Sequence, residues 1–350
     1  MKQKVIPHVR LTLGKEEIAA VTRVINSGQI AAGGEGERLE RALAQLVHCR
    51  QALVVTSGTT ALHVGLIGLG VKAGDEVIVP AYACQALLNA VYYVGATPRL
   101  VDVDLVTFNI DPAEIKRAIS GKTKAIIAPH MFGLMADVGA ITKFGVPVLE
   151  DCAMAIGAMA SGCPAGSWGD AATFSFYATK VITGGEGGAL VSNKSKVIQR
   201  ALDVRDYDKK RPFIIRYNYK LSDLNSAVIL AQMAKLQSFI KQRQAVAKRY
   251  DQALAGAKFI LPVTPRAYNH VFARYVIRTK SAKHLREYLK RNGVIAGHGV
   301  VFGLHKLIKT KHRFPKTDEI LRTAVSLPIY PALTAVEQQK IIRLLLDYKL

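Results

Sequence analysis

The chain has 350 residues, half of them hydrophobic, and 48 Lys and Arg against 26 Asp and Glu give it a formal net charge of +22. A chain of this length and composition is globular and can bury a large core, and no low-complexity segment interrupts it. No apolar run is long enough to span a bilayer, because the longest candidate, near 125–141, contains His130 and Asp137.

The first half of the chain has the pattern of an α/β domain. Residues 16–48 are predicted to form one or two amphipathic helices around a loop at 27–34. From about 52 to 192, short apolar runs alternate with helical patterns, which indicates a mainly parallel sheet of seven strands between helices. The runs are ALVV, EVIV, RLVDV, KAIIA, PVLE, ATFSF and GALVS, with helical patterns near 59–69, 84–94, 112–119 and 137–144.

The second half begins with an exposed loop at 208–216 and a long helical pattern from Ser222 to about Ala255. Beyond it, FARYVIRT is predicted to be a strand and AKHLREYLKRNG a helix closed by glycine. We therefore expect a large domain at 1–240, which includes the N-terminal helical segment, and a small α+β domain at 241–350.

Lys180 is the leading catalytic candidate. It follows the apolar run ATFSF and precedes the glycine-rich turn Gly184-Gly185-Glu186-Gly187-Gly188. A lysine held partly out of water can lose its proton and act as an amine nucleophile. This arrangement is typical of the Schiff-base lysine of an enzyme that uses pyridoxal phosphate (PLP), although a solvated lysine beside a flexible turn has the same local sequence.

Three other segments place polar groups at strand ends. Gly58 and Thr59 follow ALVV and open a helix, whose free amides can bind phosphate, and the Ser175 hydroxyl could contact the same phosphate. Asp151 closes PVLE and can pair with the protonated ring nitrogen of PLP. Taken alone, Asp151 is also a plausible cap for a helix over 152–159.

Together these segments resemble the DegT-type sugar aminotransferases, PLP enzymes of fold type I, from about Ile6 to Tyr330. The matching stretches are SGTTALHVGLIGLGVKAGDEVIVP, VGATPRLVDVDLVTFNID, TKAIIAPHMFG, VLEDCAMAIGA, GSWGDAATFSFYATK, GGEGGALVS, YNYKLSD and VSLPIYPALT.

The resemblance implies a role for each matching residue. Lys180 forms the Schiff base and shuttles the proton, and Asp151 pairs with the pyridine nitrogen. Gly58, Thr59 and Ser175 hold the phosphate. Asn218 reaches the phosphate of the neighbouring subunit's cofactor, which implies a homodimer with shared sites. The reaction moves an amino group from an amino acid, by resemblance L-glutamate, through pyridoxamine phosphate to a keto group on a nucleotide-linked sugar.

Four positions depart from the pattern of the family. Ala83-Cys84 stands where a threonine and a ring-stacking aromatic are common, and Met154 replaces a glutamine that approaches the PLP 3-hydroxyl. Gln29 replaces an aromatic, and Lys220 an arginine, so that bidentate bonding is lost. Cys84 and Met154 therefore count as cofactor contacts, and Gln29, Tyr177 and Lys220 as candidate substrate contacts. We interpret Cys84 as a buried cysteine at a helix start rather than a nucleophile, and leave His130 unassigned.

The distribution of charge and the cysteine content give further expectations about binding partners and the cellular compartment. The first 193 residues carry 16 basic and 16 acidic groups, so the whole excess of +22 lies after them and would attract anions or be a solvated face. No nucleic-acid motif is present. Four cysteines without CxxC spacing predict no metal site and a reduced compartment, and no signal peptide precedes them, which favours the cytoplasm.

Three other functions stay open. A PLP-dependent keto-sugar dehydratase resembles this family but carries histidine in place of the lysine. Aminotransfer to a cyclitol is compatible with the altered pocket residues. A non-catalytic regulatory or binding protein with a basic docking face is the alternative from another class, and the intact pair of Lys180 and Asp151 argues against it.

Overall fold

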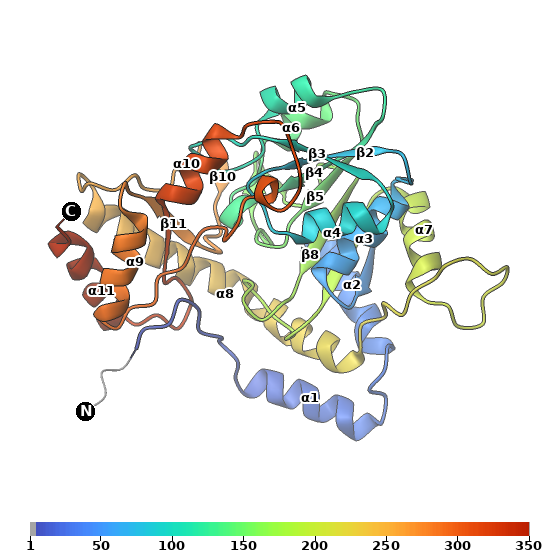
Figure 1. The fold of residues 1–350 in the computed structure, drawn as a ribbon. Coiled ribbons are helices and arrows are strands. Elements are labelled where there is room, and N and C mark those ends of the chain that lie inside the picture. Colours follow the sequence, from blue (N-terminus) through green and yellow to red (C-terminus); the bar gives the residue numbers. More distant parts are fainter. Residues whose placement is uncertain (1–4, 350) are drawn as a thin grey trace.

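The computed structural model describes residues 5–349, and a seven-stranded sheet lies at its centre (Figure 1). The strand order is β1-β9-β8-β5-β4-β2-β3. The strand β9 runs antiparallel to both of its neighbours, and the other pairs are parallel, which confirms the mainly parallel sheet of seven strands. The strands are β1 (Gln51–Val55), β2 (Glu76–Pro80), β3 (Thr97–Val101), β4 (Thr123–Pro129), β5 (Val148–Asp151), β8 (Ala171–Ser175) and β9 (Gly188–Ser192).

Helices cover both faces of the sheet, which is why its strands are apolar along their whole length. One core joins α3, α4 and α7 to the sheet through residues such as Leu87 and Ala201. A second core joins α2 and the long helix α8 (Asp223–Leu254) to the sheet, with Leu39 and Leu236 among its members. Among the described helices, none has both the length and the apolar character to cross a membrane. The first seven helices are α1 (Lys15–Ser27), α2 (Gly34–Leu46), α3 (Gly58–Gly68), α4 (Ala86–Tyr93), α5 (Pro112–Ala118), α6 (Val138–Thr142) and α7 (Ser195–Arg205).

The parallel strands end at one edge of the sheet, where ligands of α/β proteins gather. There β5 ends at Asp151, and the chain then forms turns rather than the alternative helix over 152–159. Gly157 has a φ of 80°, outside the helical region, and the short strands β6 (Met159–Ala160) and β7 (Cys163–Pro164) follow. The helix-cap interpretation of Asp151 is therefore wrong, and its Oδ1 accepts the amide of Ala153 at 3.0 Å within a turn.

The long helix α8 (Asp223–Leu254) connects the sheet to the C-terminal part, as Figure 1 shows. Its first half packs in the core under the sheet, and its second half, with Val246 and Tyr250, packs in a separate core with the C-terminal elements. The expected boundary at 240–241 falls inside this helix, and the division into two domains stays a prediction. The C-terminal elements are β10 (Tyr268–Asn269), β11 (Tyr275–Arg278), α9 (Ala282–Arg291), α10 (Pro315–Thr323), β12 (Ala324–Leu327) and α11 (Ala335–Asp347).

The loop expected at 208–216 is confirmed, because these residues form no helix or strand and project from the body of the molecule (Figure 1). Phe213 in this loop is 92% exposed.

A buried carboxylate fastens the C-terminal part to the sheet. Asp102, directly after β3, accepts the amides of Lys316 and Thr317 at 2.9 Å each and the Thr317 hydroxyl at 2.6 Å. These two residues form the first turn of α10, whose free amides and positive dipole favour a negative charge. Asp102 thus caps a helix that lies more than 200 residues away along the chain.

We predict that Asp102→Ala lowers the free energy of unfolding by about 3 kcal/mol, because it leaves buried donors at the start of α10 without an acceptor. Chemical denaturation followed by circular dichroism measures this loss. Asp347→Ala, which changes an exposed carboxylate at the end of α11, is the matched control and should leave stability within about 0.5 kcal/mol. Equal stability of the two variants would contradict the capping role.

Candidate active site

Lys180 lies in the turn that leaves β8, on the edge of the sheet where the parallel strands end. Its backbone amide donates to the Tyr177 carbonyl at 2.9 Å, which closes the turn. Gly185 follows with a φ of 81°, a conformation that favours glycine and returns the chain toward β9. The turn therefore holds Lys180 in place, and its side chain enters a cavity.

The cavity has a volume of about 310 Å³ and lies between the strand ends and the C-terminal part. Asp151 and Lys180 line it together, as the sequence predicted. Cys84 and Met154 also line it, so two of the positions that depart from the family pattern do lie beside Lys180. The other lining residues are Ala83, Gln85, Pro129, His130, Met131, Phe132, Ala153, Arg274, Gly299, Val300, Val301, Phe302 and Leu307.

Burial shifts the ionisation of the two central groups in opposite directions. Burial lowers the pKa of Lys180, while the nearby Asp151 carboxylate raises it in part. Burial also raises the pKa of Asp151, opposed by the Ala153 amide and by the charge of Lys180. Loss of water disfavours the charged form of each group, and the attraction between the two opposite charges partly offsets this effect. The pair therefore supplies an amine that loses its proton more readily than a free lysine does.

Cys84 differs from expectation. We expected a buried cysteine at a helix start, but its side chain is exposed and forms part of the cavity wall, two residues before α4 begins. That interpretation is wrong because Cys84, just before α4, faces the cavity rather than the core beneath the helix.

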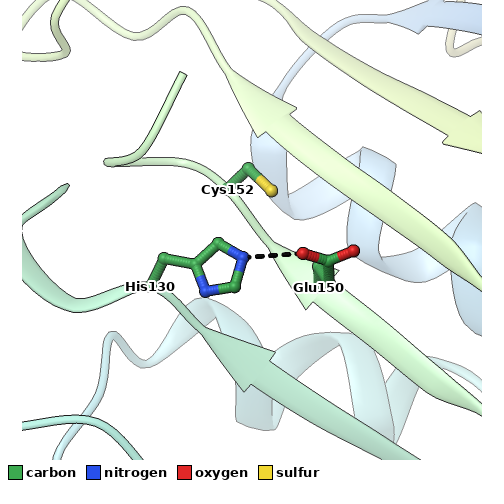
Figure 2. A group of neighbouring side chains, drawn as sticks. All are labelled: His130, Glu150 and Cys152. Carbon is green, nitrogen blue, oxygen red and sulfur yellow. Dashed lines mark hydrogen bonds and ion pairs between the residues drawn. The ribbon is translucent and has the colours of Figure 1, made fainter. Parts of the chain in front are cut away.

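Figure 2 shows the neighbouring side chains of His130, Glu150 and Cys152, of which His130 lines the cavity. Although these three residues could together bind a metal, the ring nitrogens of His130 and the carboxylate oxygens of Glu150 already form hydrogen bonds. His130 Nδ1 accepts the Ala136 amide at 3.1 Å, so its proton lies on Nε2, which donates to Glu150 at 2.9 Å. Both Glu150 oxygens also accept backbone amides, and burial raises the pKa of the Cys152 thiol. The cluster is therefore a hydrogen-bonded support for His130.

The expected phosphate site lies at the start of α3. A Cβ on Gly58 would lie 2.7 Å from the Ser175 Cβ, so glycine is required for this close approach of α3 to β8. Ser57 caps the helix by accepting the Thr60 amide at 3.1 Å, which leaves the amides of Gly58 and Thr59 directed outward at the positive end of the helix. Gly58, Thr59 and Ser175 are thus brought together, and their donors can hold an anion.

The structure does not bring the remaining candidates to the cavity of a single chain. Gln29 is exposed in the loop between α1 and α2. Lys220 Nζ forms ion pairs with Asp206 at 2.9 Å and Asp208 at 2.7 Å. Tyr177 is 48% exposed, and Asn218 is also exposed in the segment before α8. Their proposed contacts stay predictions.

Arg274, which was not predicted from the sequence, lines the cavity directly before β11. Its segment, FARYVIRT, was identified as a strand, and a single arginine before a strand is no motif. Another wall of the cavity is formed by residues 299–302, which belong to the loop at 298–314 that the sequence indicated as a determinant of the pocket. Glycine is required at position 299, because a Cβ there would collide with the Tyr82 hydroxyl.

The residues present fit pyridoxal phosphate. The cavity offers an amine that loses its proton readily, a buried carboxylate with one oxygen held by Ala153, and a neighbouring anion site at the start of α3. These groups match the aldehyde, the protonated ring nitrogen and the phosphate of that cofactor. Lys180, Asp151 and the group of Gly58, Thr59 and Ser175 are therefore the residues that would hold it.

Comparison with known proteins agrees with this geometry. Residues 11–346 match the DegT/DnrJ/EryC1/StrS aminotransferase family. DesV of S. venezuelae is 31% identical, with 94% of this chain and 93% of that chain covered and a TM-score of 0.89. An aminotransferase of this family from Brucella abortus is 27% identical over 94% of each chain, with a TM-score of 0.89. PseC of Helicobacter pylori, an aminotransferase involved in the biosynthesis of pseudoaminic acid, is 25% identical over 98% of this chain and 99% of that chain, with a TM-score of 0.91. The chain therefore belongs to the DegT/DnrJ/EryC1/StrS family of sugar aminotransferases, enzymes that use pyridoxal phosphate.

Proposed function

We propose that this aminotransferase takes the amino group of an amino acid, with L-glutamate as the donor, and transfers it to a keto group of a nucleotide-linked sugar. The observation that carries the proposal is the pairing of Lys180 with Asp151 in one cavity, beside a separate anion site at the start of α3. Membership of a family of sugar aminotransferases, with PseC, an aminotransferase involved in the biosynthesis of pseudoaminic acid, among the similar structures, supports a sugar acceptor.

The residues of the chain have distinct tasks in this reaction. Pyridoxal phosphate, when bound, supplies an electron sink, and in its pyridoxamine form it carries the amino group between the two halves of the reaction. Lys180 Nζ accepts the proton from the α-carbon of the donor, and burial favours this role because it lowers the pKa of Lys180. Asp151 lines the same cavity and would pair with the ring nitrogen of the cofactor, and the amides at the start of α3 would hold its phosphate.

The proposal includes a homodimer with shared active sites. Asn218 is exposed, and the neighbouring amides of Tyr217 and Tyr219 fix its segment by donating to Val204 and Arg205 at 2.9 Å. An ordered segment with an exposed amide side chain can reach a partner subunit. Gln29, Tyr177 and Lys220 are the candidate substrate contacts of this proposal.

Two further features fit the proposal. The net charge of +22 lies after residue 193 and would draw an anionic nucleotide-linked sugar toward the enzyme. All four cysteines are free thiols, which is compatible with the reduced compartment that we propose, the cytoplasm.

We predict that the purified protein given PLP shows the visible band of the bound cofactor, and that L-glutamate removes this band. Adding a keto sugar linked to a nucleotide should then restore it. A band that ignores glutamate would contradict the proposed donor and favour the alternative of dehydration. Restoration by a keto cyclitol, and not by keto sugars, would contradict the proposed acceptor.

The Lys180→Ala variant tests the role of the lysine in this reaction. It should show no visible band of the bound cofactor, and its turnover should be lower by about 1,000-fold or more, because the proton acceptor is removed. Lys122→Ala, a change of an exposed lysine at the start of β4, is the control and should keep full activity. Near-normal turnover by the Lys180 variant would overturn the mechanism.

A second prediction concerns pH. Because burial lowers the pKa of Lys180, the apoprotein should bind PLP faster as pH rises, with a midpoint below the value of about 10.4 for a free lysine. Asp151→Asn should move the midpoint lower still, since the carboxylate raises this pKa in the wild type. Stopped-flow absorbance gives both midpoints, with Nα-acetyl-lysine as the chemical reference. A higher midpoint in the variant would be inconsistent with a carboxylate at position 151 that raises the pKa of Lys180.

A third prediction tests the shared site. Asn218→Ala should raise the dissociation constant for PLP about tenfold, through the loss of one hydrogen bond to a charged phosphate. Titration of the apoprotein measures the constant, and light scattering shows whether the dimer persists. Gln199→Ala changes an exposed amide on α7 and should leave the affinity unchanged. Unchanged affinity in the Asn218 variant as well would argue against the shared site.

A further inference from the structure

We propose that Lys309, Lys311 and Arg313 form the receptor for the diphosphate of the nucleotide-linked sugar, at the mouth of the cavity. This inference rests on the proposed function, because it assigns one part of the acceptor to residues of this chain. The three residues lie in the loop that leads from the cavity wall to α10, which is the orange-red segment before α10 in Figure 1.

The cavity opens on the side of this loop. Val301, Phe302 and Leu307 line the cavity, yet these residues are 62%, 63% and 42% exposed. Residues that face both the cavity and solvent mark the place where a cavity opens. Lys309 follows Leu307 by two residues, so the basic part of the loop begins at this mouth.

The loop is strongly basic, and its central cations have no partner of opposite charge. Residues 306–316 contain five lysines and arginines and neither aspartate nor glutamate. Lys309, Lys311 and Arg313 are exposed, and in the described part of the chain none of them forms an ion pair with a carboxylate. Like charges so close along the chain repel one another, and a bound anion with more than one negative charge would relieve this repulsion.

Both ends of the loop are fixed to the body of the molecule. At its start, the amide of Leu304 donates to the Ala81 carbonyl at 2.7 Å, and Leu304 is buried in the core that contains α3, α4 and α7. At its end, Phe314 is buried, and the amide of Lys316 donates to Asp102 at 2.9 Å. The loop is therefore held beside the cavity wall before any ligand binds, which lowers the entropic cost of recognition.

The size of the cavity indicates which part of the acceptor reaches the loop. About 310 Å³ is small for a ligand site, and this volume must hold both the cofactor and the sugar ring, so the nucleotide lies outside. The phosphate of the cofactor has its own site at the start of α3. The diphosphate directly follows the sugar ring and therefore emerges at the mouth. None of the exposed residues of the cavity wall is a lysine or an arginine, so the diphosphate needs cations beyond the wall, which the loop supplies.

The test measures the binding of nucleoside diphosphates to the PLP-loaded protein by isothermal titration calorimetry. UDP, dTDP and GDP are the probes, and the one that binds most tightly is used for the variants. The triple variant Lys309→Gln/Lys311→Gln/Arg313→Gln should raise its dissociation constant about 30-fold, since each exposed ion pair contributes a factor of about three. Binding by this variant should also depend less on salt concentration, because fewer exposed charges meet the ligand.

The matched control removes the same charge elsewhere in the C-terminal part. Lys283→Gln/Lys290→Gln/Arg291→Gln changes three exposed cations of α9, none of which lines the cavity. Its dissociation constant for the same probe should stay within about threefold of wild type, because only the general field is weakened. The midpoint of thermal unfolding, followed by circular dichroism, shows whether both triple variants remain folded.

The outcomes separate this proposal from the proposed function. Equal losses of affinity in the two triple variants would overturn the proposal, because the general field and not the loop would then attract the nucleotide. Wild-type affinity in the loop variant would overturn it as well. In both cases the proposed function stands if a nucleotide-linked keto sugar restores the visible band of the wild type. A wild-type protein that binds none of the three probes, and whose band only a keto cyclitol restores, would contradict the proposed function itself.

Discussion

The buried carboxylate of Glu150 is the group on which the arrangement of the site depends. Its two oxygens accept the amides of Gly166 at 3.0 Å, Trp168 at 2.9 Å and Gly169 at 2.7 Å, and the Nε2–H of His130 at 2.9 Å. One side chain thus joins the end of β4, the end of β5 and the turn that leads into β8. A buried carboxylate persists only with such complete hydrogen bonding.

Asp151 and Glu150 are neighbours in β5, and their side chains lie on opposite faces of that strand. Successive side chains of β5 point to opposite faces, so Asp151 enters the cavity while Glu150 enters the core. Because β8 is held in register beside β5, with Asp151 paired to Thr173, the turn after β8 delivers Lys180 to the same cavity. The opposite shifts in the pKa values of Lys180 and Asp151 then follow from their shared burial.

The sequence was sufficient for the parts of the site that lie at strand ends. Its apolar runs gave the strands, and parallel strands end at one edge, so Gly58, Asp151, Ser175 and Lys180 could be predicted to meet. The sequence was insufficient for side chains whose environment depends on distant segments. The exposure of Cys84 is set by the cavity, and Arg274 approaches Lys180 through the packing of the C-terminal part, for which no local pattern exists.

The long helix α8 explains how such distant segments form one site. Its first half packs under the sheet that carries Lys180, and its second half packs in the C-terminal core. Arg243 lies where these halves meet, and its Nη1 holds the carbonyl groups before Arg274. The same helix therefore supports the sheet edge and the approach of Arg274 to it. Because α8 connects the two parts rigidly, the sheet can supply the amine of Lys180 and the C-terminal part the cation of Arg274 to one cavity, without a flexible linker between them.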